Sequence, residues 1–323
     1  MHILLVTPAR QGRLAGNQIT ARRWCKILRS LGHEVVVADR FSDQRTDLLL
    51  AMHAYRSADS IERFRHLHPT HPMVVALTGT DIHGFLKSDP ERTTRSLEVA
   101  NRLVVLNSLA WRTLPASARA KTFLVYEGAE PLPRARRPSR RHFEVCVIGH
   151  LREEKDPLRA ALAVRDLPDT SRIRVRHYGG CYSNQWADRA RREMACNPRY
   201  RWYGEVPHWQ VRRALSTCRV TVLSSRIEGG ANVLSEAIVA GVPVLSSDID
   251  GSVGILGQDY AGYFPVGDTA ALRACLIRAE QDPAFVRRLE EQVAHLAPRF
   301  TIAAETSRWR ELLDEAPRWR PGS

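Results

Sequence analysis

Short apolar runs that read as buried strands alternate with helical patterns along most of the chain. The first run, residues 2–7, precedes a pattern at 18–31 in which apolar side chains recur at helical spacing. The further strands that this alternation predicts are at 34–38, 47–52, 73–77, 102–106, 122–126, 143–148 and 220–223. Strands that alternate with helices form parallel sheets with helices on both faces. The sequence therefore predicts an α/β fold.

A tract rich in proline and arginine interrupts this alternation at 131–141, where three prolines and five arginines show no apolar period. A chain of 323 residues is long enough for two domains with complete cores. We therefore expect a first domain at 1–132, a linker at 133–141 and a second domain at 142–299. A basic interaction tract is the alternative interpretation of these arginines.

The stretch that bears most on function is EGGANVLSEAIVAGVPV, residues 228–244. It follows a predicted strand, and Gly229 and Gly230 open a short helix for which Asn232 is the expected N-cap. Gly241 suits the left-handed position just past the end of that helix. The N–H groups at the start of such a helix lack intrahelical partners, and together with the helix dipole they can hold a phosphate.

A carboxylate lies on each side of this phosphate position, Glu228 in the loop and Glu236 about one turn inside the helix. This arrangement suits a ligand with hydroxyls at both ends, as in a nucleotide sugar. The pair, with the run at 240–244, resembles the Glu-x7-Glu motif of retaining nucleotide-sugar glycosyltransferases of the GT-B fold. The resemblance implies that Glu228 contacts hydroxyls of the donor sugar and that Glu236 binds the ribose diol. The residues between them that it places at the donor are Gly229, Gly230, Ala231 and Asn232.

The same resemblance implies an architecture. GT-B enzymes consist of two Rossmann-like parallel-sheet domains that face a central cleft. They bind the nucleotide sugar mainly with the second domain and the acceptor with the first. A terminal helix, here at about 300–316, is expected to pack back on the first domain.

A further match to this family follows the strand at 143–148. Family members carry a Gly-Arg pair there and a lysine at the start of the next helix, and the two cations hold the donor diphosphate. Gly149 and Lys155 match, whereas His150 stands at the arginine position. We therefore assign the second cationic role to Arg152 and keep His150 as a donor-binding residue.

Two more segments bear on the donor. Residues 201–206 resemble the family's Phe-Leu-Gly-x-Val turn, whose backbone near the valine, here Val206, recognises the nucleotide base. Asp248 and Asp250 form an Asp-x-Asp pair, which elsewhere signals a metal-bound diphosphate. Because the phosphates already have a lysine and a helix terminus as partners, we expect no metal and no other cofactor, the UDP-sugar being a substrate.

The net charge of +13 fits nucleic acid, an acidic membrane surface or small anionic substrates as partners. The arginines are dispersed over many predicted helices, and the sequence contains no recognisable nucleic-acid-binding module. The helical pattern at 18–31 is basic, and a membrane-surface helix is one interpretation of it. A helix packed on a sheet is the favoured interpretation. We therefore expect anionic small-molecule substrates, with neither a nucleic-acid partner nor membrane contact.

The six cysteines contain no Cys-x-x-Cys pair, and several lie in predicted strands or helices. This pattern indicates reduced thiols and not disulfides or a zinc site. The sequence has no apolar run of about eighteen residues, and its start lacks the features of a signal peptide. We expect a cytoplasmic protein, and the sequence makes no prediction of its oligomeric state.

The first domain bears on the acceptor through the segments at 16–20, 53–58 and 77–81. With the second-domain motifs, these segments resemble one branch of the family, the selenosugar synthases of selenoneine biosynthesis. That branch implies formation of a carbon–selenium bond: UDP-N-acetylglucosamine and selenophosphate give a 1-seleno-N-acetylglucosamine, with release of UDP and phosphate. The candidate acceptor-binding residues are Arg10, Arg13, Gly16, Asn17, Thr20, Arg56, Thr78 and Thr80.

Many family members place a histidine where this chain has Thr78. A sugar hydroxyl needs its proton managed, whereas an anionic selenium nucleophile does not, so we expect no protein general base. Two alternatives stay open: a GT-B transferase with an ordinary sugar or lipid acceptor, and a non-catalytic nucleotide-sugar-binding protein. The presence of Glu228, Glu236 and Lys155 together favours an enzyme.

Overall fold

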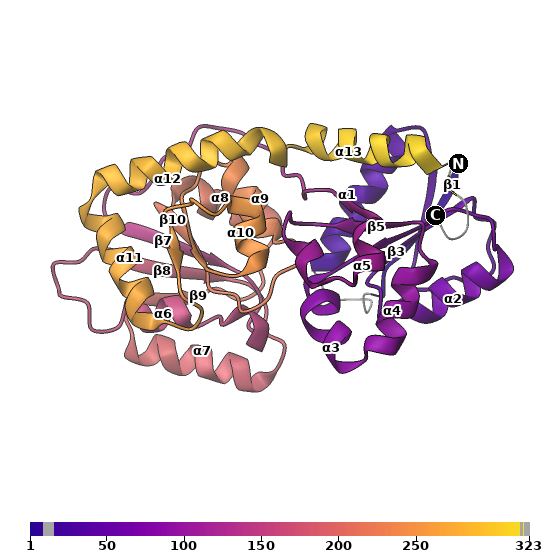
Figure 1. Cartoon of the computed structure of the whole chain (residues 1–323). Coiled ribbons are helices and arrows are strands. Elements are labelled where there is room, and N and C mark those ends of the chain that lie inside the picture. Colours follow the sequence, from indigo (N-terminus) through magenta and orange to yellow (C-terminus); the bar gives the residue numbers. More distant parts are fainter. Residues whose placement is uncertain (9–15, 317–318, 320–323) are drawn as a thin grey trace. The chain divides into compact units, whose positions relative to one another are not determined.

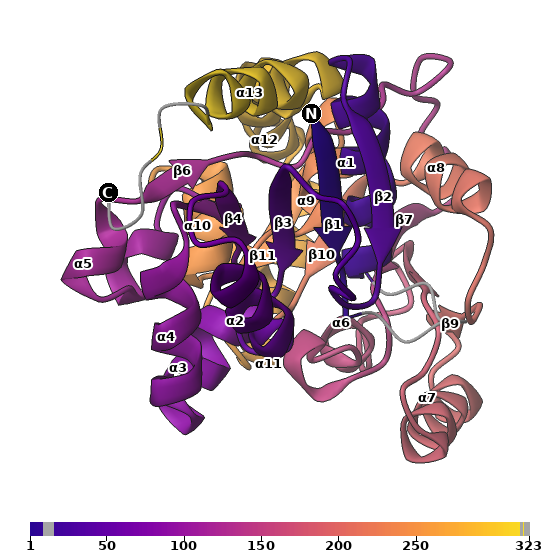
Figure 2. The same cartoon turned by 90° about the vertical axis from the view of Figure 1, so that its right-hand side faces the viewer.

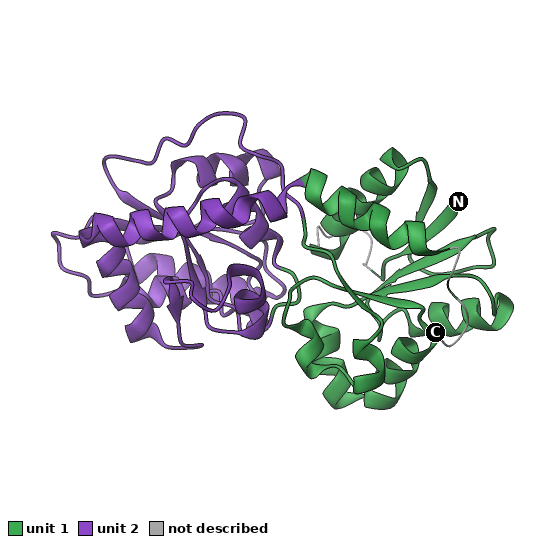
Figure 3. Cartoon of the chain, turned by 45° about the horizontal axis from the view of Figure 1, so that its top comes forward, with its two compact units in different colours: residues 1–127, 228–230, 302–323 green, residues 128–227, 231–301 purple. Residues whose placement is uncertain are grey.

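The computed structural model describes residues 1–8, 16–316 and 319. The chain divides into two compact units (Figure 3). Unit 1 contains Met1–Glu127, Glu228–Gly230 and Ile302–Ser323, and unit 2 contains Gly128–Ile227 and Ala231–Thr301. Each unit is built around one six-stranded parallel sheet.

The sheet of unit 1 has the strand order β2-β1-β3-β4-β5-β6 (Figures 1 and 2). Its strands are β1 (His2–Val6), β2 (Glu34–Ala38), β3 (Leu48–Met52), β4 (Met73–Ala76), β5 (Arg102–Val105) and β6 (Thr122–Leu124). Its helices are α1 (Gly16–Ser30), α2 (Ala58–Leu67), the π-helix η1 (Asp81–Phe85), α3 (Leu86–Ser88), α4 (Pro90–Val99), η2 (Ala110–Thr113), α5 (Ala116–Arg119) and α13 (Ile302–Glu315).

Both faces of this sheet are buried, because successive side chains of a strand point to opposite sides and helices cover each side. On one side, Leu5 lies in a cluster with Trp24 of α1 and Trp309 of α13. The two indole rings meet edge to face with centroids 4.8 Å apart. On the other side, Leu4 lies in a cluster with Phe64 of α2. Strand β1 therefore contributes to both cores of unit 1.

A buried polar network joins α1 to α13 inside unit 1. The Arg23 guanidinium lies 2.8 Å from Glu305 and 3.0 Å from Glu127. Trp24 Nε1 donates to Glu305 over 2.7 Å. Burial by itself lowers the pKa of Arg23, but the charges of Glu127 and Glu305 outweigh it and the pKa is raised. Arg23 is thus an internal structural cation.

The sheet of unit 2 has the order β12-β11-β10-β7-β8-β9. Its strands are β7 (Phe143–Ile148), β8 (Ile173–Tyr178), β9 (Tyr200–Trp202), β10 (Val220–Leu223), β11 (Val244–Ser247) and β12 (Tyr263–Phe264). Its helices are η3 (Glu153–Lys155), α6 (Arg159–Ala163), α7 (Asn184–Cys196), α8 (His208–Thr217), α9 (Asn232–Val239), α10 (Asp250–Leu256), α11 (Thr269–Gln281), α12 (Pro283–Leu296) and η4 (Ala297–Phe300).

The predicted alternation of strands and helices is confirmed, and each strand expected from an apolar run is present. The helix after the two glycines needs one correction. Asn232 is the first residue of α9 and not its N-cap, which is the extended residue Ala231. The carbonyl of Ala231 accepts the first bond of the helix, from the Leu234 N–H. In the described part of the chain, no side chain caps this end by a hydrogen bond. The left-handed glycine is confirmed, since Gly241 has φ +66°.

The residues expected to form a linker, 133–141, run along unit 2. The backbone N–H groups of Arg137 and Ser139 donate to the carbonyls of Ser216 and Thr217 over 2.8 and 2.9 Å. The guanidinium of Arg136 is largely buried and donates to the Cys218 carbonyl over 2.9 Å. Arg136 therefore anchors this segment to the rest of unit 2. Among the described helices, none combines the length and apolar character needed to cross a bilayer.

Candidate functional site

The topology of unit 2 marks one position for a ligand. Strands β7 and β10 are neighbours, while the chain leaves β7 toward β8 and β9 and leaves β10 toward β11 and β12. The strand order reverses between β7 and β10, and ligands of open parallel sheets bind outside the carboxyl ends of strands at such a point.

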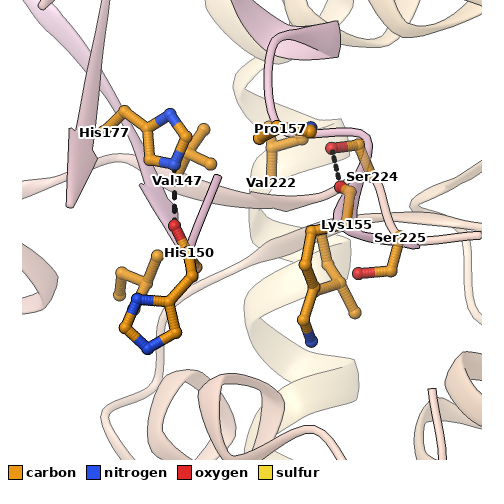
Figure 4. Close-up of a pocket in the computed structure, with 11 residues that line it drawn as sticks. Val147, His150, Lys155, Pro157, His177, Val222, Ser224 and Ser225 are labelled. Carbon is orange, nitrogen blue, oxygen red and sulfur yellow. Dashed lines mark hydrogen bonds between the residues drawn. The ribbon is translucent and has the colours of Figure 1, made fainter. Parts of the chain in front are cut away.

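A pocket lies at this position. It is lined by Val147, Ile148, Gly149, His150, Lys155, Pro157, His177, Val222, Leu223, Ser224 and Ser225. Figure 4 shows the His150 ring and the Lys155 side chain extending toward the same side of the pocket. Three of the sequence-predicted donor residues, Gly149, His150 and Lys155, therefore meet in one pocket.

A buried histidine holds the Gly149 carbonyl in place. His177 Nε2 is 2.9 Å from the Gly149 oxygen, and its Nδ1 is 2.9 Å from the Tyr200 hydroxyl. Burial lowers the pKa of His177 to about 4, with the hydrogen bond to Gly149 opposing the shift and the nearby His150 adding to it. A neutral ring has one hydrogen, and a carbonyl can only accept, so Nε2 donates to Gly149 and Nδ1 accepts from Tyr200.

Close backbone approach also fixes this loop. A Cβ on Gly179 would lie 2.0 Å from the Gly149 oxygen, and Gly179 has φ +151°. The Gly180 N–H donates to His150 Nδ1 over 3.0 Å. When His150 is neutral, its hydrogen is therefore on Nε2. The imidazole at the family's arginine position can act as a hydrogen-bond donor through that atom.

Lys155 ends the short helix η3, and Ser224, the residue after β10, contacts its backbone. The Ser224 hydroxyl lies 3.2 Å from the Lys155 carbonyl (Figure 4). It also lies 2.9 Å from the Asp156 carbonyl. Asp156 has a left-handed φ of +43°, and its carboxylate pairs with Arg159 at 2.8 Å. Lys155 thus lies in a turn that is held by Ser224 and by the ion pair between Asp156 and Arg159.

Arg152, the other predicted cation, is not among the residues that line the pocket. Its guanidinium lies 5.3 Å from the centre of the Tyr182 ring, and its Nε is 3.9 Å from Glu154. Arg152 Nε is buried and has no hydrogen-bond partner among the residues that the structure describes. Tyr182 also lies beside the His150 ring, with centroids 5.8 Å apart.

Glu236 of α9 pairs with His208, the first residue of α8, over 3.2 Å between Oε1 and Nε2. The hydrogen bond to Glu236 raises the pKa of His208 against the effect of burial. Val206 lies in the loop between β9 and α8, two residues before His208. The predicted base-binding turn and the predicted ribose-binding carboxylate are therefore joined through His208, which the sequence did not indicate.

Close packing within unit 1 explains why both motif positions, Gly229 and Gly230, are glycine. A Cβ on Gly229 would lie 2.2 Å from the Gly79 nitrogen, and one on Gly230 would lie 2.6 Å from the Leu106 side chain. Asn107 Nδ2 donates to the Gly229 carbonyl over 2.6 Å. Glu228, next to them, is only 5% exposed. The glycines of the motif thus allow a close backbone packing that no other residue would fit.

The predicted acceptor residues of unit 1 lie in several different elements. Thr78 and Thr80 lie together after β4, with their hydroxyls 3.1 Å apart. Gly16 and Asn17 form the first turn of α1, while Arg56 is exposed after β3. Thr20 is 3% exposed, and its hydroxyl donates to Glu127 over 2.5 Å. Arg10 and Arg13 lie outside the described residues.

Sequence reasoning missed several residues that the structure brings to these positions, namely His177, Gly179, His208, Ser224 and Ser225. It included His53 and Asp81 in the acceptor segments 53–58 and 77–81 but gave neither of them a role. Most of the missed residues lie within a few residues of a strand's carboxyl end, which is the signal that could have indicated them. Within residues 1–8, 16–316 and 319, no group of three or more His, Cys, Asp or Glu side chains is placed to hold a metal ion.

Comparison with known proteins bears on the family and the fold. The family model described as "Glycosyl transferases group 1" matches residues 132–295. A search of curated proteins gave no matching sequence.

Three solved structures share the fold. HepE from Anabaena in complex with UDP-glucose has a TM-score of 0.80 and 13% identity, covering 98% of this chain and 100% of its own. Sucrose-phosphate synthase from Thermosynechococcus elongatus has a TM-score of 0.77 and 17% identity, covering 97% and 98%. The lipopolysaccharide outer core galactosyltransferase WaaB has a TM-score of 0.69 and 15% identity, covering 98% and 99%. Likeness at these identities confirms the predicted fold of two Rossmann-like parallel-sheet domains.

Proposed function

The chain belongs to the group 1 glycosyltransferases, and from this we propose that it transfers a sugar from a UDP-sugar bound at the unit 2 pocket. The observation that carries the donor assignment is the presence of Lys155 and the Gly149 loop at the switch point of the sheet. The fold relative HepE was solved with UDP, with UDP and glucose and with UDP-glucose. A nucleotide diphosphate is the ligand that Lys155 and the His150 imidazole at this position suit best.

We assign the donor residues as follows. Lys155 and Arg152 offset the negative charge that develops as UDP departs, and such charges act mainly in the transition state. His150 adds a hydrogen-bond donor beside Lys155. Glu228 orients the sugar, and Glu236 accepts from the ribose diol. The described structure supports Lys155 and His150 most directly, because both line the pocket.

The proposed sugar is N-acetylglucosamine, and the proposed acceptor is selenophosphate. The selenium of selenophosphate bonds to C1 of the sugar as the C1–O bond to UDP breaks and the electron pair leaves with UDP. Hydrolysis of the P–Se bond by water then releases phosphate and the selenosugar. Support for this acceptor comes from the unit 1 segments at 16–20, 53–58 and 77–81, which resemble the selenosugar synthases.

The proposed mechanism uses no protein general base to generate the nucleophile, because the selenium is already ionised. The 2-acetamido group of the donor assists departure of UDP. The proposed compartment is the cytoplasm, where free thiols persist, and the six cysteines are unpaired in the structure.

A lipid acceptor is the principal alternative. Its support is the basic helical pattern at 18–31, of which residues 18–30 belong to α1. In the structure Arg23 of that helix is bound to two buried carboxylates. Arg29 donates to the Val35 carbonyl over 2.7 Å. These contacts take two of the four cations of α1 into internal bonds, which favours a small anionic acceptor over a membrane surface.

The test is release of UDP from UDP-N-acetylglucosamine with and without selenophosphate, with the product mass recorded. We expect selenophosphate-dependent release and a selenium-containing sugar. Lys155→Ala is expected to lower turnover at least a hundredfold, while Lys26→Ala, which removes an exposed lysine of α1, leaves it unchanged. Release that ignores selenophosphate would overturn the acceptor, and absence of any UDP release would support a non-catalytic binder.

A further inference from the structure

Two buried side chains that can carry opposite charges meet at the carboxyl edge of the unit 1 sheet. His53 follows β3 and is 1% exposed, while Asp81 follows β4 by a few residues and is fully buried. His53 Nδ1 lies 2.6 Å from Asp81 Oδ1. β3 borders the point at which the strand order of this sheet reverses, because β1 lies between β2 and β3.

The contacts of Asp81 identify it as a carboxylate. Its Oδ1 accepts from the Tyr55 N–H over 3.0 Å, and its Oδ2 accepts from the N–H and the hydroxyl of Thr78, each over 2.9 Å. A carboxylate has no hydrogen to give, so the hydrogen in the 2.6 Å contact must be on His53 Nδ1. The Arg56 N–H, 3.3 Å from the same nitrogen, is then a contact and not a hydrogen bond.

The remaining contacts close a ring. His53 Nε2 is 3.1 Å from the Thr80 hydroxyl, which is 3.1 Å from the Thr78 hydroxyl, which is bonded to Asp81. The ring has four contacts, each of which needs one hydrogen. The two threonines supply two hydrogens and a neutral imidazole supplies one. Only the imidazolium form of His53 supplies the fourth, so the complete ring requires a buried ion pair.

Two local features of the backbone coincide with this ring. His53 has φ +75°, a strained conformation for a residue other than glycine. Asp81 begins η1, a π-helix. π-helices are rare in proteins, and those that occur are frequently found at functional sites. Strained residues that persist because their surroundings fix them are concentrated at active sites and ligand clamps.

We propose that His53, held as an imidazolium by Asp81, is a positioning residue for the substrate that binds at this edge of unit 1. It fixes the two threonine hydroxyls with their hydrogens turned inward. The Thr80 oxygen then has one remaining lone pair, whereas the second lone pair of Thr78 faces the Asp81 N–H at 3.4 Å. Both residues are half-buried at the edge. The Thr80 hydroxyl therefore acts as a hydrogen-bond acceptor for the substrate.

This arrangement selects a substrate group that brings its own hydrogen. The sequence indicates Thr78 and Thr80 as candidate acceptor-binding residues, and both of their hydrogens are already used inside the ring. A hydroxyl on an oxyanion, such as the P–OH of hydrogen selenophosphate, or the alcohol of a sugar, has the required hydrogen. The choice between selenophosphate and a sugar alcohol rests on the proposed function. The hydrogen-bond ring itself does not depend on that function.

The ring is tested first by NMR of the full chain labelled with 15N-histidine, the His53 signals being identified by their loss in His53→Gln. We expect both ring nitrogens of His53 to be protonated. Thr80→Val removes the partner of Nε2, so His53 should become neutral with its hydrogen on Nδ1, while Thr80→Ser should keep the imidazolium. A singly protonated His53 in the unmodified protein, unchanged by Thr80→Val, would overturn the ring.

The substrate role is tested by selenophosphate-dependent UDP release. Thr80→Val should raise KM for the acceptor about tenfold, the loss of one hydrogen bond, with little change in kcat, and Thr80→Ser should restore it. Thr122→Val removes a threonine hydroxyl elsewhere in unit 1 and serves as the control. Equal KM values for Thr80→Val and the unmodified protein would overturn the role. If no turnover occurs, the proposed function fails while the NMR experiment still decides the ring.

Discussion

The ring of His177 donates to the carbonyl of Gly149 over 2.9 Å, and this bond ties strand β8 to the loop that lines the unit 2 pocket. The histidine is fully buried and neutral, and its second nitrogen is occupied by Tyr200. The position of the Gly149 loop therefore depends on a side chain from the neighbouring strand.

The stability of unit 2 should fall with acidification because of this histidine. The pKa of His177 is about 4 in the folded chain, below its ordinary value of 6.5, so the unfolded chain binds more protons between these pH values. Stability is complete above pH 6.5 and declines toward pH 4, by about 3 kcal/mol in total from this group. Urea unfolding from pH 7 to 4 measures it. His177→Gln should be less stable at pH 7 and should show a shallower decline, and equal slopes for both proteins would contradict the assignment.

UDP binding should strengthen as pH rises because of His208. Because the pKa of His208 is raised by Glu236, the pair is fully charged below the ordinary histidine value and is lost as pH rises through the raised one. Above that range Glu236 is released for the ribose, so affinity for UDP should increase. Calorimetric titration of UDP at several pH values measures this increase.

His208→Gln is the matched variant for that experiment, since it keeps a polar side chain without a titrating charge. Titration of the UDP phosphates and of other groups affects both proteins equally. We expect the difference in affinity between them to disappear at high pH. A constant difference across the pH range would show that His208 does not compete for Glu236.

Gly229→Ala should destabilise unit 1. Its Cβ would lie 2.2 Å from the Gly79 nitrogen, a backbone atom that cannot move aside as a flexible side chain can. We expect a loss of about 1–3 kcal/mol in the free energy of unfolding, with lower UDP-release activity. Gly84→Ala is the control, because a Cβ there would meet no atom of the described residues within 4 Å. Equal unfolding midpoints for the two variants would refute the packing argument.

Glu305→Ala should loosen α13 from unit 1. The substitution leaves Arg23 with one of its two carboxylates and removes the partner of Trp24 Nε1. Breaking a buried ion pair costs about 3–5 kcal/mol. Glu311→Ala removes an exposed partner of Arg308 on the same helix and should change stability by less than about 1 kcal/mol. Thermal unfolding and limited proteolysis at the C-terminus measure both effects.

The sequence predicted the six strands of unit 1, the strands β7 and β10 of unit 2 and the helix α1, because apolar runs and helical spacing report burial directly. It also predicted Gly149 and Lys155, which lie close together along the chain in a motif. It placed the N-cap of α9 one residue late, because the extended segment after the glycines ends at Ala231. That boundary depends on where the glycines pack and not on local preference.

The contacts that the sequence did not predict are made across strands. His177 reaches Gly149 because β8 pairs with β7 in register, with His177 opposite Val147. His53 and Asp81 are 28 residues apart and meet only because β3 and β4 are neighbours. Single-strand patterns contain the residue types but not the pairing, so these contacts required the folded chain.

The chain passes between the two units four times, after Glu127, Ile227, Gly230 and Thr301. Two of these crossings bound the three residues Glu228–Gly230, which belong to unit 1 although their neighbours on both sides belong to unit 2. The units are consequently not exchangeable as two continuous gene segments. A chimaera with a relative would have to transfer this tripeptide together with residues 1–127. Otherwise the two glycines would pack against the surface of a different unit 1, to which they are not fitted.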